Sequence, residues 1–585
     1  MKKTYSSILI VLFICSFKLY ADSTYTCVQM PGSTENILVR PLNAQSIIPT
    51  THFIIHYNDP TTFEYANNTA NFAEFAYQKI CVELGWRVPP DDDNQGGDNR
   101  YDIYIVDESV IPGYNGWTVP EVPQGWNNEF CPSFIVIRNT IETESELKMV
   151  VAHEFNHATQ LAYSYLDGYS DTWFLENTAV WVAEEIYDYQ YQYYKRYFNV
   201  GFDPADPLDY PEYGIHTKYR DGVLRFYIYA SFLWPKFLAE WQNDPEIVRR
   251  IYERFGENPG EHVMEDIDYV LQNYYQTDLD EAARYYAEWR YFTGTRDDGL
   301  HFHNAYDLPT SRVSIIPNFP DQLMMGYGGT VFLQYPSTPD IINFSFDGQD
   351  NFKWSASVIQ ERYEPPTQNI ILPLDNNYYG AQDFPTEGCY NLILTPIFLS
   401  YGDYKKSYTF SVTNYEGKKV FFTNSVDGNN FNLGGYLLLD NIQTIPSGDF
   451  KWLRSNSPHN IKTLSERFIG ASTKKHNNWN AAYNYYFLSK PFTVTSSNYN
   501  QNARFKSLNN ATIRNVIDKM SFNDSISIKF NDPWYVKDQY DNQSGMEDFI
   551  SFPSPYYPTG KYNQSSGGVF LDQGDDWQPP YYSVK

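Results

Sequence analysis

The first three hundred residues carry two hydrophobic patterns. Residues 52–57, 101–107 and 134–138 are short apolar runs typical of strands, and residues 62–86 place apolar side chains at helical spacing. Further helices are predicted at residues 173–187, 224–240, 245–255, 263–275 and 279–291. These elements indicate one α+β domain over residues 51–305, in which a small sheet with helices precedes a helical part.

Beyond residue 305 the pattern changes to short strand-like runs, separated by turn residues about every ten positions. The runs are residues 313–317, 329–335, 341–346, 369–374, 390–399 and 408–413. They predict a β-sandwich over residues 306–413. Residues 414–585 are rich in Asn, Ser, Tyr and Gly and include strand-like runs such as KVFFT and SISIKF, which predicts a second β-rich module.

The N-terminus has the layout of a secretory signal peptide over residues 1–21. Two lysines precede an apolar run from Ile8 to Phe17, which is too short to span a bilayer, and cleavage is expected after Ala21. The protein is therefore predicted to be secreted, periplasmic or held at the cell surface. A lipid anchor on Cys15 is a weaker alternative, because no small residue precedes it. Residues 22–50 form an N-terminal extension.

Composition restricts the partners of this chain of 585 residues. A formal net charge of −28 disfavours nucleic acid and anionic membrane surfaces as partners. After export, Cys27, Cys81, Cys131 and Cys389 remain, and an even number in an oxidising compartment allows one or two disulfides. A bond between Cys81 and Cys131 is the favoured pairing, and four buried thiols are the alternative.

An amphipathic helix is predicted after Thr143, which forms a capping box with Glu146. Its apolar stripe consists of Leu147, Val150, Val151, Ala158 and Leu161. Glu154 falls within this stripe. A buried carboxylate costs several kcal/mol unless it is paired, hydrogen-bonded or faces a cavity. The position of Glu154 within the apolar stripe therefore indicates that its carboxylate has a chemical role.

His153 and His157 flank this glutamate in the pattern H-E-x-x-H. The histidines are four positions apart, so both rings lie on one face of the helix and can reach one metal ion. In this pattern Zn²⁺ activates water and polarises a carbonyl, while the glutamate acts as general base. The sequence predicts zinc at His153 and His157, with Glu154 as the catalytic base.

A catalytic zinc needs a third protein ligand. The metzincin pattern is excluded, because Gln160 and Tyr163 stand where Gly and His are required. Glu176, in the helix-forming stretch 171–188, is the predicted ligand, since nineteen residues after His157 allow a second helix to return antiparallel. The alternatives are Glu184, Glu185, Asp167 and Asp171, of which the first two fit a solvated helix face better.

The pair of histidines with a helix-borne Glu176 resembles the gluzincin group of zinc peptidases, to which thermolysin belongs. The stretch WFLENTAVW further resembles a family of exported bacterial metalloproteases that carry W-x-x-E-x-x-A-x-W after H-E-x-x-H, often with C-terminal β-sandwiches. The resemblance covers roughly residues 50–300, and more loosely the sandwich. It implies a zincin-like fold, with zinc at His153, His157 and Glu176 and with Glu154 as base.

One position departs from the thermolysin-like pattern. Those enzymes place an aspartate four residues after the ligand glutamate to orient a zinc histidine, and Val180 stands here. The partner of the ligand histidines must therefore come from elsewhere. A donor for the oxyanion is also needed, and Tyr229, His216 and Tyr219 are candidates, although core packing is the commoner role of such side chains.

A weaker motif precedes the second predicted strand. Asp91, Asp93, Gln95, Gly96 and Asp102 occupy positions 1, 3, 5, 6 and 12 of a calcium-loop pattern. The pattern allows a Ca²⁺ site with Asp91, Asp93 and Asp102 as ligands. A solvated acidic turn explains the same residues and is the preferred interpretation.

These observations together predict a secreted zinc metallopeptidase that acts on proteins or peptides. Its β-rich domains are expected to dock a surface, carbohydrate or protein partner. The alternative is a surface-binding or adhesive protein with a vestigial or structural zinc site, which the large aromatic C-terminal half favours. A zinc hydrolase acting on non-peptide substrates is a third hypothesis.

Overall fold

A computed structural model describes most of the chain between Val39 and Thr463, and short strands beyond it. The described residues are 39–41, 44–121, 130–163, 171–187, 207–217, 227–258, 262–315, 326–336, 340–364, 366–401, 406–426, 436–440, 442–446, 448–463, 485–487, 490–493, 500–507, 525–528, 534–539, 547–552, 560–563 and 569–570. The predicted signal peptide and Cys27 lie outside them. No helix in these ranges is long and apolar enough to cross a membrane.

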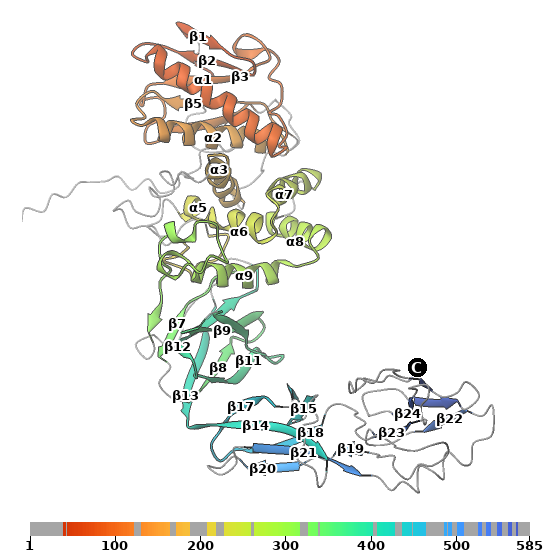
Figure 1. Ribbon diagram of the computed structural model, residues 1–585. Helices are drawn as coiled ribbons and strands as arrows, with labels where there is room; N and C mark the ends of the chain where they lie inside the picture. The colour runs from red at the N-terminus through yellow and green to blue at the C-terminus, as the bar shows by residue number, and fades with distance from the viewer. Residues whose placement is uncertain are drawn as a thin grey trace, which may run out of the picture.

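The N-terminal part is built on a five-stranded sheet in the order β1-β2-β3-β5-β4 (Figure 1). Its strands are β1 (Ser46–Pro49), β2 (Phe53–Tyr57), β3 (Tyr101–Val106), β4 (Gly116–Pro120) and β5 (Ser133–Arg138). The central strands β2, β3 and β5 are parallel and correspond to the three predicted strands. They read as continuous apolar runs because both faces of the sheet are covered.

The edge strands β1 and β4 pair antiparallel with their neighbours and were not predicted. Strand β4 reads GWTVP, so it begins with glycine and ends with proline, two residues that are depleted in strands. Proline is tolerated at a sheet edge, where it need not donate to a ladder. Strand β4 therefore forms because it pairs with β5, and not because its residues favour a strand.

Helices α1 (Phe63–Tyr77) and α2 (Glu144–Gln160) pack on one face of the sheet, and α1 continues into a short π-helix, η1 (Gln78–Glu83). Helix α2 begins as predicted, because the Thr143 hydroxyl accepts a hydrogen bond from the backbone N–H of Glu146 at 3.1 Å. A second apolar cluster that includes Tyr104, Trp117 and Phe134 covers the opposite face. The sheet is therefore buried on both sides.

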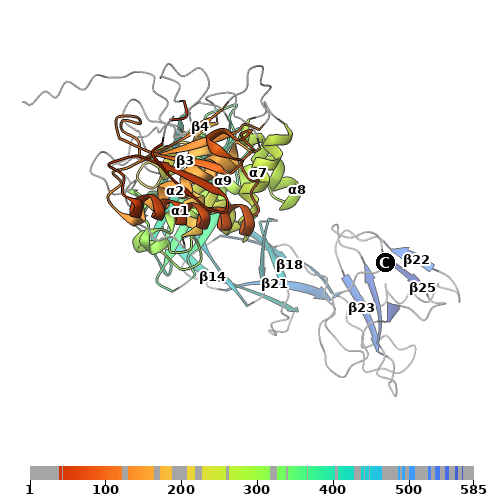
Figure 2. The ribbon, with the colours of Figure 1, turned by 90° about the horizontal axis from the view of Figure 1, so that it is seen from above.

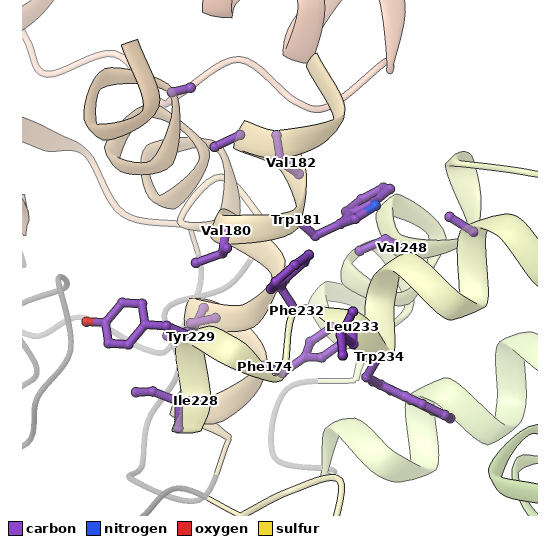
Figure 3. Close-up of a cluster of buried hydrophobic side chains, with 14 of the residues drawn as sticks. Phe174, Val180, Trp181, Val182, Ile228, Tyr229, Phe232, Leu233, Trp234 and Val248 are labelled. Atoms are coloured by element: carbon purple, nitrogen blue, oxygen red, sulfur yellow. The ribbon is translucent and has the colours of Figure 1, made fainter. Parts of the chain in front are cut away.

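A helical part follows the sheet. It comprises α3 (Thr172–Ile186), α5 (Tyr227–Ala230), α6 (Leu233–Trp241), α7 (Glu246–Glu257), α8 (Val263–Tyr274) and α9 (Leu279–Tyr291). Helix α3 is buried along almost its whole length, including its polar residues Glu176, Asn177 and Glu184. Figure 3 shows Phe174 and Trp181 of α3 gathered with Phe232, Trp234 and Val248 in one apolar cluster.

The single helix predicted at residues 224–240 is wrong in one respect, because the structure interrupts it. Helix α5 ends at Ala230 and α6 begins at Leu233. Pro235 has no backbone N–H, so it cannot make the helical hydrogen bond to residue 231 that a continuous helix requires. The proline is instead placed in the first turn of α6, where no such bond is needed.

The chain becomes β-rich beyond α9. Two sheets, β10-β9-β12-β7-β6 and β11-β8-β13, share one apolar core that includes Leu333, Phe344, Val358, Phe384 and Leu394. Their strands are β6 (Ser314–Ile315), β7 (Leu333–Pro336), β8 (Ile341–Gly348), β9 (Trp354–Arg362), β10 (Gln368–Ile371), β11 (Tyr379–Pro385), β12 (Cys389–Phe398) and β13 (Tyr408–Tyr415). Strands β9 and β11 were not predicted.

Further sheets begin at β14 (Gly417–Val426), which joins the order β17-β14-β21-β19-β23-β24-β26. The remaining strands are β15 (Tyr436–Leu439), β16 (Gln443–Pro446), β17 (Phe450–Arg454), β18 (Pro458–Thr463), β19 (Tyr485–Phe487), β20 (Lys490–Thr493), β21 (Asn500–Ser507), β22 (Ser525–Ile528), β23 (Trp534–Gln539), β24 (Glu547–Phe552), β25 (Gly560–Asn563) and β26 (Val569–Phe570). Figures 1 and 2 both place β22 and β23 far from the N-terminal sheet. A mixed α/β region is thus followed by a β-rich C-terminal region.

The favoured disulfide between Cys81 and Cys131 is wrong, because both are free thiols in the structure. Cys81 lies on η1 and packs beside the main core, whereas Cys131 is buried in a separate contact with Leu161. Burial raises the pKa of each thiol to about 12. Both therefore behave as small apolar side chains with little thiolate character.

Candidate metal centre

Helices α2 and α3 bring His153, His157 and Glu176 to one point in the protein interior. The Nε2 atoms of the two histidines lie 3.0 Å apart. The Oε2 atom of Glu176 lies 3.2 Å from Nε2 of His153 and 3.4 Å from Nε2 of His157. Each of the three residues is at most 1% exposed. Within the described ranges, no other group of three His, Cys, Asp or Glu side chains is arranged to hold a metal ion.

The three ligand atoms form a triangle that suits a tetrahedral zinc ion. Ligands at about 2.0 to 2.1 Å from such an ion stand about 3.3 Å apart, close to the three distances above. Two imidazole nitrogens and one carboxylate oxygen also match the donor set of catalytic zinc sites, which keep the fourth position open. The side chains present therefore fit Zn²⁺.

Electrostatics couple the three groups. Burial works against the charged forms, yet the two imidazoles lower the pKa of Glu176 to about 2. Burial likewise disfavours the imidazolium of His157, but the Glu176 carboxylate outweighs it and raises the pKa of His157. Burial prevails at His153, and its pKa is lowered. Glu176 is thus held as a carboxylate that faces both rings.

His157 is oriented from its own helix. Its Nδ1 atom lies 2.8 Å from Oε1 of Gln160, the last residue of α2. A ligand histidine usually donates its second ring N–H to such an acceptor. Gln160 therefore provides a partner for the second ring nitrogen of His157, at a site where Val180 offers no hydrogen-bonding group. The sequence motif contained Gln160, but nothing in its spacing marked it as a partner of His157.

The Glu154 side chain contacts strand β4. The Thr118 hydroxyl oxygen lies 2.8 Å from Oε2 of Glu154 and 2.9 Å from the Glu154 carbonyl oxygen, so its O–H holds this residue. Glu154 is 1% exposed, and an alanine Cβ at Gly116 would lie 2.7 Å from its Cγ. The carboxylate is therefore seated between its helix and the sheet edge. Sequence reasoning missed both β4 residues.

The candidate oxyanion donors are placed differently. The ring centroids of Tyr229 and His153 lie 6.0 Å apart. Figure 3 shows the Tyr229 hydroxyl directed away from the apolar cluster. His216 instead packs on Tyr401, with ring centroids 5.5 Å apart. Tyr219 lies outside the described residues. Tyr229 is thus the candidate that the structure places beside a ligand histidine.

The alternative third ligands are not grouped with the histidines. Asp171 stands directly before α3, Asp167 is outside the described residues, and Glu184 and Glu185 lie near the end of α3. The expectation of a solvated face is wrong for Glu184, which is fully buried, whereas Glu185 is half-buried. The reason is that α3 is surrounded by other elements on nearly all sides.

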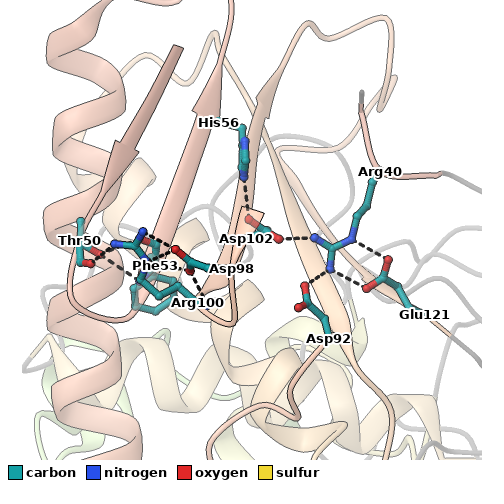
Figure 4. Close-up of polar contacts among 9 residues, drawn as sticks. All are labelled: Arg40, Thr50, Phe53, His56, Asp92, Asp98, Arg100, Asp102 and Glu121. Atoms are coloured by element: carbon teal, nitrogen blue, oxygen red, sulfur yellow. Dashed lines mark hydrogen bonds and ion pairs between the residues drawn. The ribbon is translucent and has the colours of Figure 1, made fainter. Parts of the chain in front are cut away.

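The calcium motif is not assembled in the structure. Asp102 lies on β3, where its carboxylate contacts Arg40 and also lies 2.6 Å from Nε2 of His56 (Figure 4). Asp91 and Asp93 remain exposed in the loop. The three carboxylates do not form a metal-binding group among the described residues. The Ca²⁺ ligand set is therefore corrected, because the Asp102 carboxylate instead contacts the Arg40 guanidinium and the His56 imidazole.

Arg40 binds the carboxylates of this region, which the calcium-loop pattern did not predict. It contacts Asp92 and Asp102, and it binds Glu121 through two hydrogen bonds of 2.6 and 2.7 Å (Figure 4). These carboxylates come from a loop, from β3 and from the residue after β4. One guanidinium of the N-terminal extension thus joins three parts of the sheet region.

Comparisons with known proteins place this chain in no family. No protein-family model and no curated protein matches it. Among solved structures, a family GH115 4-O-methyl-alpha-glucuronidase with specificity for decorated arabinogalactans is similar at 9% identity, with a TM-score of 0.13. The match covers 57% of this chain and 54% of the other, so the chain spans about half of that protein. A TM-score this low does not establish a common fold.

Proposed function

We propose that the protein is an exported, zinc-dependent metallopeptidase of the gluzincin type. The observation that supports this most is the meeting of His153, His157 and Glu176 from two helices, with Glu154 seated beside them. A structural zinc site is closed by four protein ligands and has no need of a base. Three ligands and a buried glutamate therefore favour catalysis.

The proposed roles follow from the chemistry of each side chain. His153, His157 and Glu176 would hold Zn²⁺, which when bound supplies a Lewis acid for water and for a substrate carbonyl. Glu154 accepts a proton from water and returns it to the leaving amine. Thr118 keeps one oxygen of that carboxylate in place. Tyr229 is the proposed donor to the oxyanion.

The N-terminal leader and the β-rich half complete the proposal. Export through residues 1–21 would bring the enzyme to proteins or peptides outside the cell. The β-rich domains would dock the substrate or a surface. Cell fractionation with antibody detection of the full chain tests export, and an intracellular pool that retains residues 1–21 would contradict it.

The decisive experiment compares Glu154→Gln with wild type. This variant should bind zinc and fold as wild type does, yet lose at least about a hundredfold of its activity on casein or gelatin, because no base remains. Glu144→Gln is a matched control, since Glu144 lies in the exposed first turn of the same helix. Hydrolysis by Glu154→Gln at the wild-type rate would overturn the proposal. Wild-type hydrolysis that is unchanged by a chelator would overturn it as well.

A surface-binding function is the second candidate, and one feature of the sandwich favours it. Tyr363 and Tyr390 are 75% and 41% exposed, and their rings lie 5.4 Å apart. Paired exposed aromatic rings are suited to contact a partner. If this function is the main one, Glu176→Ala should leave binding to cells or polysaccharide unchanged, whereas Tyr363→Ala should weaken it.

A further inference from the structure

The buried amide of Gln160 makes three contacts at the metal centre. Its Oε1 lies 2.8 Å from Nδ1 of His157. Its Nε2 donates to Oδ1 of Asn156 at 2.9 Å and to the Leu175 carbonyl oxygen at 3.1 Å. Gln160 is 1% exposed, so water does not compete for these bonds.

The neighbouring bonds fix which end of this amide faces His157. The Thr159 hydroxyl donates to the Asn156 carbonyl oxygen at 2.7 Å, so its oxygen accepts from Nδ2 of Asn156 at 3.2 Å. Oδ1 of Asn156 must then face Gln160, and it requires a donor there. The Leu175 carbonyl requires a donor as well. Only the NH₂ end of Gln160 can serve both acceptors.

The consequence for His157 is a defined tautomer. Because Oε1 of Gln160 is an acceptor, the facing Nδ1 of His157 carries the hydrogen. The other nitrogen, Nε2, is then left with its lone pair directed to His153 and Glu176. This is the form in which an imidazole binds a metal ion.

The contact with Leu175 also joins the two ligand helices. Leu175 directly precedes Glu176 on α3, and Gln160 ends α2 three residues after His157. The bond from Nε2 of Gln160 to the Leu175 carbonyl therefore sets the distance between the second histidine and the third ligand.

We propose that Gln160 is a positioning residue of the metal centre, acting as an uncharged hydrogen-bond acceptor that fixes the tautomer of His157 and links it to the helix of Glu176. The inference rests on the zinc site of the proposed function and does not depend on which substrate is cleaved. A neutral amide at this place adds no negative charge to the site, in contrast to an aspartate.

Three variants of the full chain test this role. Gln160→Met keeps the length of the side chain but removes the acceptor, and zinc affinity measured against a chromophoric chelator should fall about 10- to 100-fold. Thr159→Val removes the hydroxyl at the far end of the chain of bonds with almost no change in volume, and affinity should fall about 3- to 10-fold. Thr159→Ser retains the hydroxyl and should restore the wild-type value.

A spectroscopic measurement separates positioning from mere packing. The Co²⁺-loaded Gln160→Met protein should show a visible absorption spectrum altered from wild type, while its unfolding in chelator, although at a lower temperature because buried hydrogen bonds are lost, should remain cooperative. Wild-type protein that binds no zinc would refute the proposed function. Wild type that binds zinc, with Gln160→Met of equal affinity and equal spectrum, would refute only the role of Gln160.

Discussion

Gly116 of the edge strand β4 lies directly against the side chain of Glu154 on α2. A Cβ built on Gly116 would stand 2.7 Å from Cγ and 2.8 Å from Oε1 of Glu154. Both distances are shorter than ordinary contacts, so only glycine allows the strand to approach this closely. The position of the Glu154 side chain therefore depends on glycine at position 116 of strand β4.

Gly116→Ala should displace Glu154 without touching any ligand of the proposed metal. A shift of about 1 Å in a catalytic group can cost about a hundredfold in rate, so kcat on casein-derived peptides should fall by about that factor. Zinc content, measured by atomic absorption, should stay at the wild-type level. Unchanged kcat in a folded Gly116→Ala protein would show that the contact does not position the base.

Glu176→Ala should release the metal. With only two imidazoles left, zinc content after dialysis should fall from about one ion per chain to below about 0.2. Glu185→Ala serves as the matched control, because Glu185 lies on the same helix and is half-buried away from the histidines. Full zinc content in Glu176→Ala would remove this residue from the ligand set.

Zinc binding should weaken as pH falls. Burial opposes the charge on His157, but Glu176 raises the pKa of this ring above its ordinary value of 6.5, so below that raised pKa the metal-free site holds a proton that the metal must displace. Affinity should therefore decrease from about pH 8 to about pH 6, by up to about tenfold per pH unit for one displaced proton. Chelator competition at several pH values measures this, and a flat profile would contradict it.

Arg40→Met should destabilise the sheet region. The substitution leaves the carboxylate of Asp102, which is 0% exposed, without the guanidinium that it contacts. Breaking a buried ion pair by removing one partner costs about 3 to 5 kcal/mol. Calorimetry should show a lower unfolding temperature for the N-terminal part.

A matched arginine provides the control for that measurement. Arg100 pairs with Asp98 at 2.6 Å on the surface beside the same sheet. Exposed pairs contribute little to stability, so Arg100→Met should leave the unfolding temperature nearly unchanged. Equal changes in unfolding temperature for the two substitutions would mean that the buried contacts of Arg40 contribute no more to stability than an exposed ion pair.

The sequence anticipated those elements whose signal is local. The apolar runs that became β2, β3 and β5, and the helical repeats that became α1, α2 and α3, are periodic over a few residues. The pair His153 and His157 belongs to this class too, since four residues on a helix place two rings on one face whatever surrounds them.

Glu176 was predicted to lie near the two histidines, but other partners that come from distant parts of the chain were not foreseen. Strand β4 has weak propensity, and it exists because β5 pairs with it. Asp102 matched one position of a calcium-loop pattern, and its contacts with Arg40 and His56 could not be predicted from that pattern. Glu184 looked solvated on a helix face that other helices cover. In each case the sequence does not indicate which group from a distant part of the chain makes the contact.

The sequence by itself determined the helix that carries the two histidines and the glutamate, because helical geometry repeats within a single turn. Only the tertiary structure decided that β4 seats Glu154, that α3 turns Glu176 toward both rings, and that Gln160 faces His157 with its oxygen. Those relationships depend on hydrogen bonds and packing between residues 3 to 36 positions apart, whose orientation no local periodicity encodes.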